Sequence, residues 1–256
     1  MSVAAKPQPG FPWLVIALAI PALAVLLALG TWQVQRLAWK ENLIATVERR
    51  MAADPLPILE ATFGADQSEG IDYRPVTLSG TFVPDEVFFE FTTHKGISGW
   101  NLFHLLEYEP DQRDRGLRYT IVNRGFIPYD MRDTWREVAP LPTDAVEVAG
   151  LLRMPLTGKP GFALPDNEIE ERTFYWRSTV DMAVAAGIEP EVVTAWYVDE
   201  GMPGNGKLGD WPVTGTTIVT FSNNHLQYAI TWYGLALTLV GVVGFFVYGR
   251  MRGGKT

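Results

Sequence analysis

Cysteine is absent from this sequence of 256 residues. Its absence excludes disulfides, thiolate zinc sites, iron–sulfur clusters and cysteine nucleophiles together. It also argues against a copper chaperone that works through a pair of cysteine thiolates. It does not identify a cellular compartment, because a well-packed domain of this size can be stable without disulfides.

Charged residues are missing from two long stretches, one toward each end of the chain. The first runs from Phe11 to Thr31 and the second from Leu226 to Tyr248. Because about 20 apolar helical residues cover the ~30 Å hydrocarbon core of a bilayer, we expect transmembrane helices at 11–31 and 225–248. A cleaved signal peptide is the alternative for the first stretch. The stretch is longer than the ~7–15-residue apolar region of such a peptide and lacks a clear cleavage site, which favours the transmembrane helix.

Glycines interrupt the second stretch at Gly234, Gly241 and Gly244. Small residues in a transmembrane helix either let a second helix approach closely or simply face lipid, and the sequence leaves both interpretations open. Aromatic residues lie near both ends of this stretch, as is typical of helices that cross membrane interfaces.

The segment between the two stretches is strongly acidic. From Arg36 to Gln227 it holds 17 of the 21 basic residues and all 29 acidic residues, which leaves a formal charge of −12. Such a segment is repelled by phosphate backbones and by anionic lipid headgroups. Nucleic-acid binding is therefore disfavoured, and we expect no nucleic acid among the partners.

Basic residues after the second stretch predict the orientation of the chain. Arg250, Arg252 and Lys255 lie within eight residues of its end, so this end is expected to be cytoplasmic. With two spans, the N-terminus then lies on the same side, and the acidic domain lies outside the cytoplasm. Basic residues that follow the first stretch oppose this assignment. Glutamates are interleaved with them, however, and long domains are translocated largely regardless of charge.

Helical periodicity continues beyond the first stretch and then gives way to strand patterns. Apolar residues recur at three- and four-residue spacings over 32–54, until the run Asp54-Pro55-Leu56-Pro57 ends the helix. Alternating polarity, or β-branched and aromatic residues between Gly/Pro/Asp clusters, then predicts eight strands. These strands are expected at Tyr73–Phe82, Val87–Thr93, Asn101–Tyr108, Arg118–Ile127, Ala145–Met154, Arg172–Arg177, Val192–Val198 and Thr214–Phe221. One short helix is expected at Thr179–Ala186.

These patterns predict a membrane α+β fold. Two transmembrane helices, one N-terminal and one C-terminal, flank an antiparallel β-rich extracytoplasmic domain at 55–222, which is barrel- or sandwich-like. A cytoplasmic tail is expected at 249–256. Strands without intervening helices favour an antiparallel sheet over a parallel α/β fold.

Signals for an active site are few. His94 and His104 are ten residues apart on expected strands, without clustered acids beside them. We therefore expect surface or partly buried polar residues rather than metal ligands. The run Gly158-Lys159-Pro160-Gly161 lacks the strand–turn–helix setting of a phosphate-binding loop and is expected to be a turn. The sequence contains no Gly-x-Ser-x-Gly or other nucleophile motif, so an enzyme is disfavoured.

The entry to the second stretch carries the most informative residues. Ser222, Asn223 or Asn224 can cap the helix, which places His225 in or next to its first turn. The positive end of the helix dipole disfavours a protonated imidazole there, and a neutral imidazole can ligate a haem iron. Trp232 follows two turns later on the same face, where an indole can stack on a porphyrin. The alternative is an interfacial histidine bonded to lipid headgroups, with Trp232 as an aromatic-belt residue.

Several short motifs occur in order along most of the chain. They are Gly30–Lys40 (GTWQVQRLAWK), Tyr73–Val76 followed by Gly80–Phe82, Gly99–Phe103, Val122–Pro128, Val148–Arg153 and Asn223–Tyr233 (NNHLQYAITWY). With these motifs in order and both apolar stretches in place, the sequence closely resembles the surfeit locus protein 1 family, membrane-anchored assembly factors of cytochrome c oxidase. Phe126 stands where the family often has tryptophan, which is a conservative change.

The resemblance implies a non-enzymatic role in the maturation of haem–copper oxidases. It implies an assembly factor that binds haem a transiently, or hands it over, while subunit I of cytochrome c oxidase matures. His225 is then the candidate ligand of the haem iron, with Trp232 as its companion. Arg74 and Arg124 match arginines of the family's motifs, and they pair either with haem propionates or, structurally, with the many acids of the domain.

The same resemblance implies partners and a location. The expected partners are subunit I, haem a synthase and other assembly factors, together with the lipid bilayer. We expect the bacterial inner (plasma) membrane, with the central domain periplasmic and both termini cytoplasmic. A mitochondrial origin is the alternative, but Met1–Gly10 carries only Lys6 and no arginine-rich presequence.

Two rival functions remain open. One is a haem-free membrane scaffold that stabilises an oxidase assembly intermediate. The other is a periplasmic hydrolase, which is disfavoured because the sequence shows no paired nucleophile and base.

Overall fold

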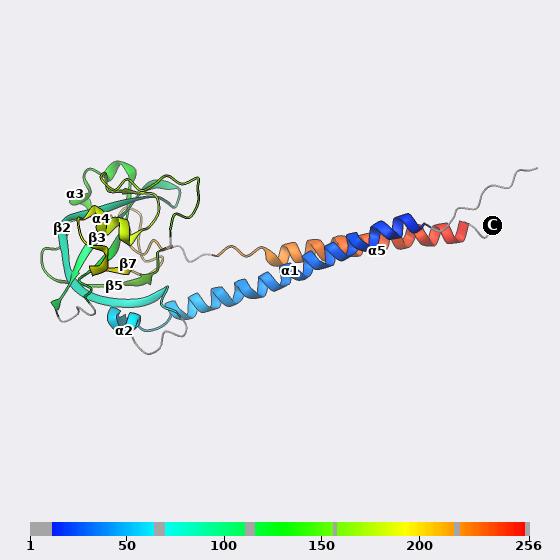
Figure 1. The fold of residues 1–256 in the computed structure, drawn as a ribbon, viewed down its shortest axis with the longest axis horizontal. Coiled ribbons are helices and arrows are strands. Elements are labelled where there is room, and N and C mark those ends of the chain that lie inside the picture. The colour runs from blue at the N-terminus through cyan, green and yellow to red at the C-terminus, as the bar shows by residue number, and fades with distance from the viewer. Residues whose placement is uncertain (1–11, 64–69, 111–115, 156–157, 218–220, 254–256) are drawn as a thin grey trace, which may run out of the picture. The chain divides into compact units, whose positions relative to one another are not determined.

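The structure is a computed structural model that describes residues 12–63, 70–110, 116–155, 158–217 and 221–253 (Figure 1). It divides into two compact units. One consists of Met1–Thr46 with Thr220–Thr256, and the other of Val47–Val219. The first unit holds two long helices, and the second is a β-rich domain.

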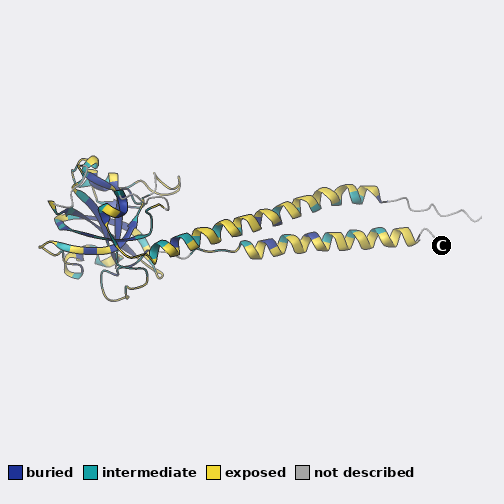
Figure 2. Cartoon of the chain, turned by 90° about the horizontal axis from the view of Figure 1, so that it is seen from below, coloured by how far each residue is buried: buried dark blue, intermediate teal, exposed yellow. Residues whose placement is uncertain are grey.

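Two long apolar helices make up the first unit. Helix α1 (Trp13–Met51) has 39 residues, and helix α5 (His225–Gly253) has 29. Both are long and apolar enough to cross a membrane, and only 6% of the most apolar window of each is buried. The core helix of a soluble protein would be mostly buried, whereas these helices expose most of their surface (Figure 2). The chain is therefore a membrane protein with an apolar helix toward each end. The predicted first residue of the first span, Phe11, and residues 254–256 of the predicted tail lie outside the described residues.

The second unit contains seven strands, three short α-helices and two 3-10 turns within its described residues. In chain order they are β1 (Leu56–Pro57), α2 (Ile58–Phe63), β2 (Arg74–His94), β3 (Ile97–Tyr108), β4 (Tyr119–Pro128), η2 (Tyr129–Met131), α3 (Trp135–Val138), β5 (Val146–Arg153), β6 (Thr173–Phe174), α4 (Thr179–Ala185), η3 (Pro190–Val192) and β7 (Val193–Glu200). The sheet order is β1-β2-β3-β4-β7-β5, with β6 beside β2.

Strand β2 belongs to two parts of this sheet. Its first part, Arg74–Gly80, pairs with β5, and its second part, Gly80–His94, pairs with β3. The sheet thus folds back on itself and is sandwich-like rather than a clean barrel. The β-rich domain between two apolar helices is confirmed. Its pairing is mixed rather than wholly antiparallel, because β1–β2, β2–β6 and β4–β7 are parallel.

Three predicted strands differ from the observed ones. The strands expected at Tyr73–Phe82 and Val87–Thr93 form one strand, because the residues between them make a bulge instead of a turn. Asp85 within that bulge has φ 63°. The strand expected at Thr214–Phe221 is not found in residues 214–217, while 218–220 lie outside the described residues. Val213 makes a single bridge to Phe126 at that edge.

Aromatic side chains dominate the core of the domain. Tyr108, Phe88, Phe103, Phe126 and Phe174 are the largest side chains that are fully buried. Inward-facing residues of β2, β3, β4 and β7 supply most of the three apolar clusters, and α2 and α4 each cover one of them. Burial of this kind contributes about 25 cal/mol for each Å² of apolar surface removed from water.

A buried polar network joins β2, β4 and β7 within this core. The Asp199 carboxylate, 1% exposed, accepts hydrogen bonds from Asn123 Nδ2 at 2.8 Å and from Thr217 Oγ1 at 2.6 Å. Arg177 Nε donates to the Glu90 carboxylate at 2.8 Å. Burial alone would lower the pKa of Arg177, but Glu90 and neighbouring groups raise it well above its ordinary value. Each buried charge named here has a partner, which offsets the cost of removing it from water.

A second bulge, in β4, depends on one glycine. Leu102 pairs with Gly125 and Phe103 with Asn123, which leaves Arg124 as the extra residue. Gly125 has φ 126°, and a Cβ there would lie 2.3 Å from the carbonyl oxygen of Val213. A side chain at this position therefore meets both backbone strain and rigid backbone atoms.

We expect Gly125→Ala to lower the free energy of unfolding by about 3 kcal/mol, the sum of left-handed strain and overpacking. Gly96→Ala is the matched control, because Gly96 has φ 83° but nothing within 4 Å of its would-be Cβ. It should lose only about 1 kcal/mol. Thermal unfolding of the two variants measures the difference, and equal losses would show that the contact with Val213 is not tight.

His104 is fully buried, whereas the sequence predicted a surface or partly buried side chain; His94 is partly buried, as expected. The ring of His104 lies against Phe82 and Trp135, with centroids 5.9 and 5.1 Å away. Neither of its nitrogens has a hydrogen-bond partner among the described atoms. Burial lowers the pKa of His104 well below 6.5, and Arg124 and Arg136 lower it further.

This lowered pKa predicts an acid-sensitive fold. Above pH 6.5 the imidazole is neutral in both states, so its contribution to stability is fully present. Below pH 6.5 the unfolded chain binds a proton that the folded chain does not, and stability falls by up to about 1.4 kcal/mol per pH unit. Unfolding temperatures between pH 6.5 and 5 should therefore fall less steeply in His104→Phe than in the wild type. His94→Gln serves as the comparison: burial and Lys95 lower the pKa of His94 less than the pKa of His104 is lowered, so most of the steep fall should remain. The same slope in all three proteins would contradict the assignment.

Candidate functional site

The candidate site lies within the helical unit, where α5 begins. His225 is the first residue of α5, and residues 221–224 before it are not helical. The amide of Tyr228 donates to the carbonyl of Asn224 at 3.2 Å, which closes the first turn. The structure thus places His225 at the start of the helix, as its sequence predicted.

Gln33 of α1 holds the imidazole of His225. Its Oε1 lies 2.7 Å from His225 Nδ1, and Gln33 is only 8% exposed. Because a carbonyl oxygen can only accept, Nδ1 is the donor of this hydrogen bond, and in the neutral imidazole Nε2 then keeps its lone pair. Within the described part of the chain, Nε2 has no hydrogen-bond partner. The hydrogen bond therefore fixes both the tautomer and the orientation of the ring.

Trp32, the residue before Gln33, also contacts the imidazole. The two ring centroids are 6.5 Å apart and the ring planes are perpendicular, at 86°. Trp32 is 50% exposed, so one side of the indole remains accessible. The imidazole is thus flanked by a polar and an aromatic residue of the same helix.

A close helix contact sets the register of this arrangement. Gly30 is buried, and a Cβ there would lie 2.8 Å from Tyr233 Cε1. The hydroxyls of Thr31 and Tyr233 lie 3.1 Å apart. The glycines Gly234, Gly241 and Gly244 have nothing within 4 Å of a would-be Cβ, so the close approach occurs at Gly30 instead.

Trp232, the companion of His225 predicted from sequence, lies two turns further along α5. Its side chain is half-buried, and its indole nitrogen is buried without a hydrogen-bond partner among the described atoms. No ring contact between Trp232 and His225 is found within the described residues; the aromatic ring beside His225 is that of Trp32. Sequence reasoning missed Trp32 and Gln33, although both belong to the Gly30–Lys40 motif.

The two arginines of the other motifs lie in the β-rich domain. Arg124 donates to the carbonyls of Ala139 and Pro140 at 3.1 and 3.2 Å, and lies 3.8 Å from the Glu200 carboxylate. Its role within the domain is therefore structural pairing, one of the two alternatives left by the sequence. Arg74 begins β2, and its Nε is buried without a hydrogen-bond partner among the described atoms.

Comparison with known proteins places these residues in a family. A model of the SURF1 family matches residues 20–237, which include Gln33, His225 and Trp232. Surfeit locus protein 1 of Homo sapiens is 31% identical over 242 residues, covering 86% of this chain and 73% of the human protein. The protein of the same name from Rattus norvegicus is 32% identical over 238 residues, covering 85% of this chain and 70% of its own length.

A third relative matches over a still larger share of both chains. The SURF1-like protein of Monosiga brevicollis is 30% identical over 265 residues, covering 100% of this chain and 93% of its own length. Both apolar helices and the β-rich domain between them fall within the matched region. This chain therefore belongs to the SURF1 family.

Proposed function

We propose that this protein is a non-enzymatic assembly factor for haem–copper (cytochrome c) oxidase that binds haem a through His225 and hands it over while subunit I matures. The hydrogen bond between Gln33 and His225 carries the proposal. A histidine that ligates a metal almost always donates its other ring N–H to an acceptor, and Gln33 is that acceptor here. The lone pair of Nε2 is left for iron.

The donor set suits a haem better than a free metal ion. The chain has no cysteine, and no group of three or more histidine and acidic residues that could hold an ion is found in the part that the structure describes. A single imidazole suffices when a porphyrin supplies the remaining equatorial ligands, as in proteins with one proximal histidine. Trp232, whose buried indole N–H has no hydrogen-bond partner among the described atoms, is the second residue that we assign to haem contact.

One protein ligand also suits a carrier. A haem held by one imidazole is more easily released than a haem held by two, and release is required of a protein that delivers its cargo. Gln33 positions the ligand without contributing a second bond to iron. Family membership favours such a non-catalytic role, and the motifs of the sequence contain no paired nucleophile and base.

The proposed location is the bacterial inner membrane. Arg250 and Arg252 end α5 and favour a cytoplasmic C-terminus, which supports a periplasmic location for the β-rich domain. The start of α5, with the His225 site, then lies near the periplasmic interface of the membrane. The proposed partners are subunit I of the oxidase, the haem a synthase that supplies the cargo, and other assembly factors.

Absorption spectra of the full chain purified from cells that make haem a test this function. We expect a Soret band in the wild type and its loss in His225→Ala. Gln33→Leu should weaken haem a binding about 10- to 100-fold, the usual effect of removing a hydrogen-bond partner of a ligating histidine.

Gln35→Leu provides a matched control, because Gln35 is an exposed glutamine of the same helix. It should bind haem a like the wild type. A wild-type protein without a Soret band, or a band that survives His225→Ala, would support the haem-free scaffold instead.

A further inference from the structure

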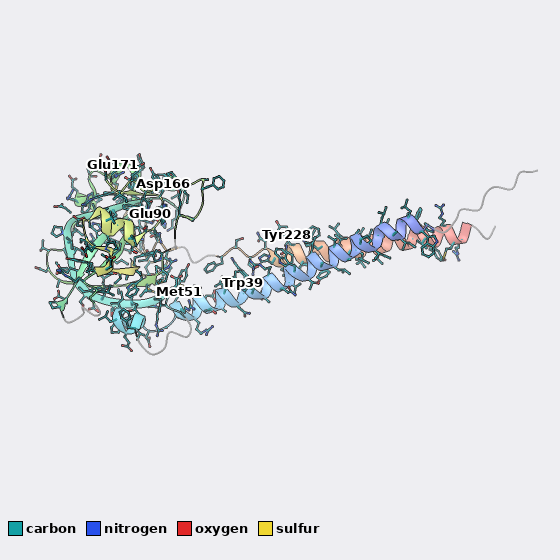
Figure 3. The ribbon with its side chains drawn as sticks, viewed as in Figure 1. Trp39, Met51, Glu90, Asp166, Glu171 and Tyr228 are labelled. Carbon is teal, nitrogen blue, oxygen red and sulfur yellow. The ribbon has the colours of Figure 1, made fainter. Side chains whose placement is uncertain are left out.

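A stripe of aromatic and basic side chains runs along one face of α1 from the His225 site. Trp32, Arg36 and Trp39 are spaced by four and three residues, which places them on the same side of a helix. Both tryptophans are 50% exposed, and Trp39 projects from α1 in Figure 3. The stripe is therefore open to a ligand along its length.

The orientation of Trp32 suits a flat ligand bound at His225. A porphyrin whose iron is ligated by an imidazole lies perpendicular to the imidazole ring. The indole of Trp32 is also perpendicular to that ring, at 86°, and its centroid is 6.5 Å from it. Two planes that are each perpendicular to the imidazole can be parallel to one another, so this angle permits the indole to stack on the face of the macrocycle, an interaction that stabilises by about 0.5–1.5 kcal/mol.

The basic residues of the stripe suit the carboxylates at the edge of such a ligand. The guanidinium of Arg36 lies 4.3 Å from the ring centroid of Trp39, which holds it in place. Arg36 makes no ion pair within the described residues, so its donors remain available. Lys40 follows one turn later, with its ammonium 5.4 Å from the ring of Phe221. Guanidinium groups bind carboxylates through two parallel hydrogen bonds.

We infer that Trp32 and Arg36 form the α1 half of the ligand site, which takes a flat tetrapyrrole with peripheral carboxylates. Trp32 stacks on the macrocycle and Arg36 pairs with a carboxylate, while His225 ligates the iron. The inference rests on the proposed function for iron ligation alone. An aromatic belt that only faces headgroups does not require Trp32 to contact the imidazole, and this contact favours the ligand site.

Titration of the full chain in detergent with haem a and with its dimethyl ester tests both residues. Trp32→Leu should weaken binding of both forms about tenfold, because stacking does not depend on the carboxylates. Arg36→Gln should weaken binding of haem a about fivefold and leave binding of the diester unchanged, because the diester has no charge to pair. The Soret band should keep its position in both variants, since His225 still ligates the iron.

Two matched variants control for the substitutions themselves. Trp13→Leu removes an exposed tryptophan from the first residue of α1. Arg252→Gln removes a guanidinium that lies 5.0 Å from the ring of Tyr248. Both should bind haem a like the wild type. Their positions are remote from His225 along the helices that carry them.

The outcomes separate this inference from the proposed function. If His225→Ala abolishes the Soret band while Trp32→Leu and Arg36→Gln bind haem a with wild-type affinity, the inference is wrong and the proposed function stands. If the wild type shows no band that depends on His225, the proposed function is wrong. Iron-free protoporphyrin IX then tests the stripe alone, and binding that both variants leave unchanged overturns the inference as well.

Discussion

The hydrogen bond between Gln33 and His225 determines what the helical unit can do. The two residues are 192 positions apart in the sequence, and only a fixed register between α1 and α5 brings them to 2.7 Å. Gly30 provides that register, because its missing side chain leaves room for the ring of Tyr233. A polar pair at the start of an apolar helix is thereby held in one geometry. Its Nε2 lone pair is the feature on which the proposed haem binding depends.

Different contacts stabilise the β-rich domain. Its strands are joined by hydrogen-bonded buried charges such as Asp199 and Glu90, and bulges in β2 and β4 bend the sheet back on itself. His104 is an exception, since its buried nitrogens have no partner among the described atoms. A domain built in this way is specified by many polar contacts, and the lowered pKa of His104 predicts that it is sensitive to acid. By contrast, the specific contacts identified in the helical unit are few and lie around Gly30, Gln33 and His225.

Composition and periodicity predicted much of the fold. Stretches without charge identified both long helices, and alternating polarity found most strands, because both signals are local. The break predicted between the strands that end at Phe82 and begin at Val87 is a bulge, because the left-handed conformation of Asp85 keeps the strand continuous. The site was harder to predict. Helical spacing within α5 pointed to Trp232, whereas Gln33 and Trp32 come from the other helix, and their contact with His225 is a tertiary feature that no local pattern encodes.

The tautomer of His225 tests the account most directly, and it can be measured without any ligand. The chain has only three histidines, so ¹⁵N spectra of the histidine-labelled protein can be assigned with His225→Ala. We expect the neutral form of His225 to carry its proton on Nδ1, and we expect Gln33→Leu to abolish this preference. A proton on Nε2 in the wild type, or a tautomer unaffected by Gln33→Leu, would contradict the claim that Gln33 presents Nε2 as a ligand for iron.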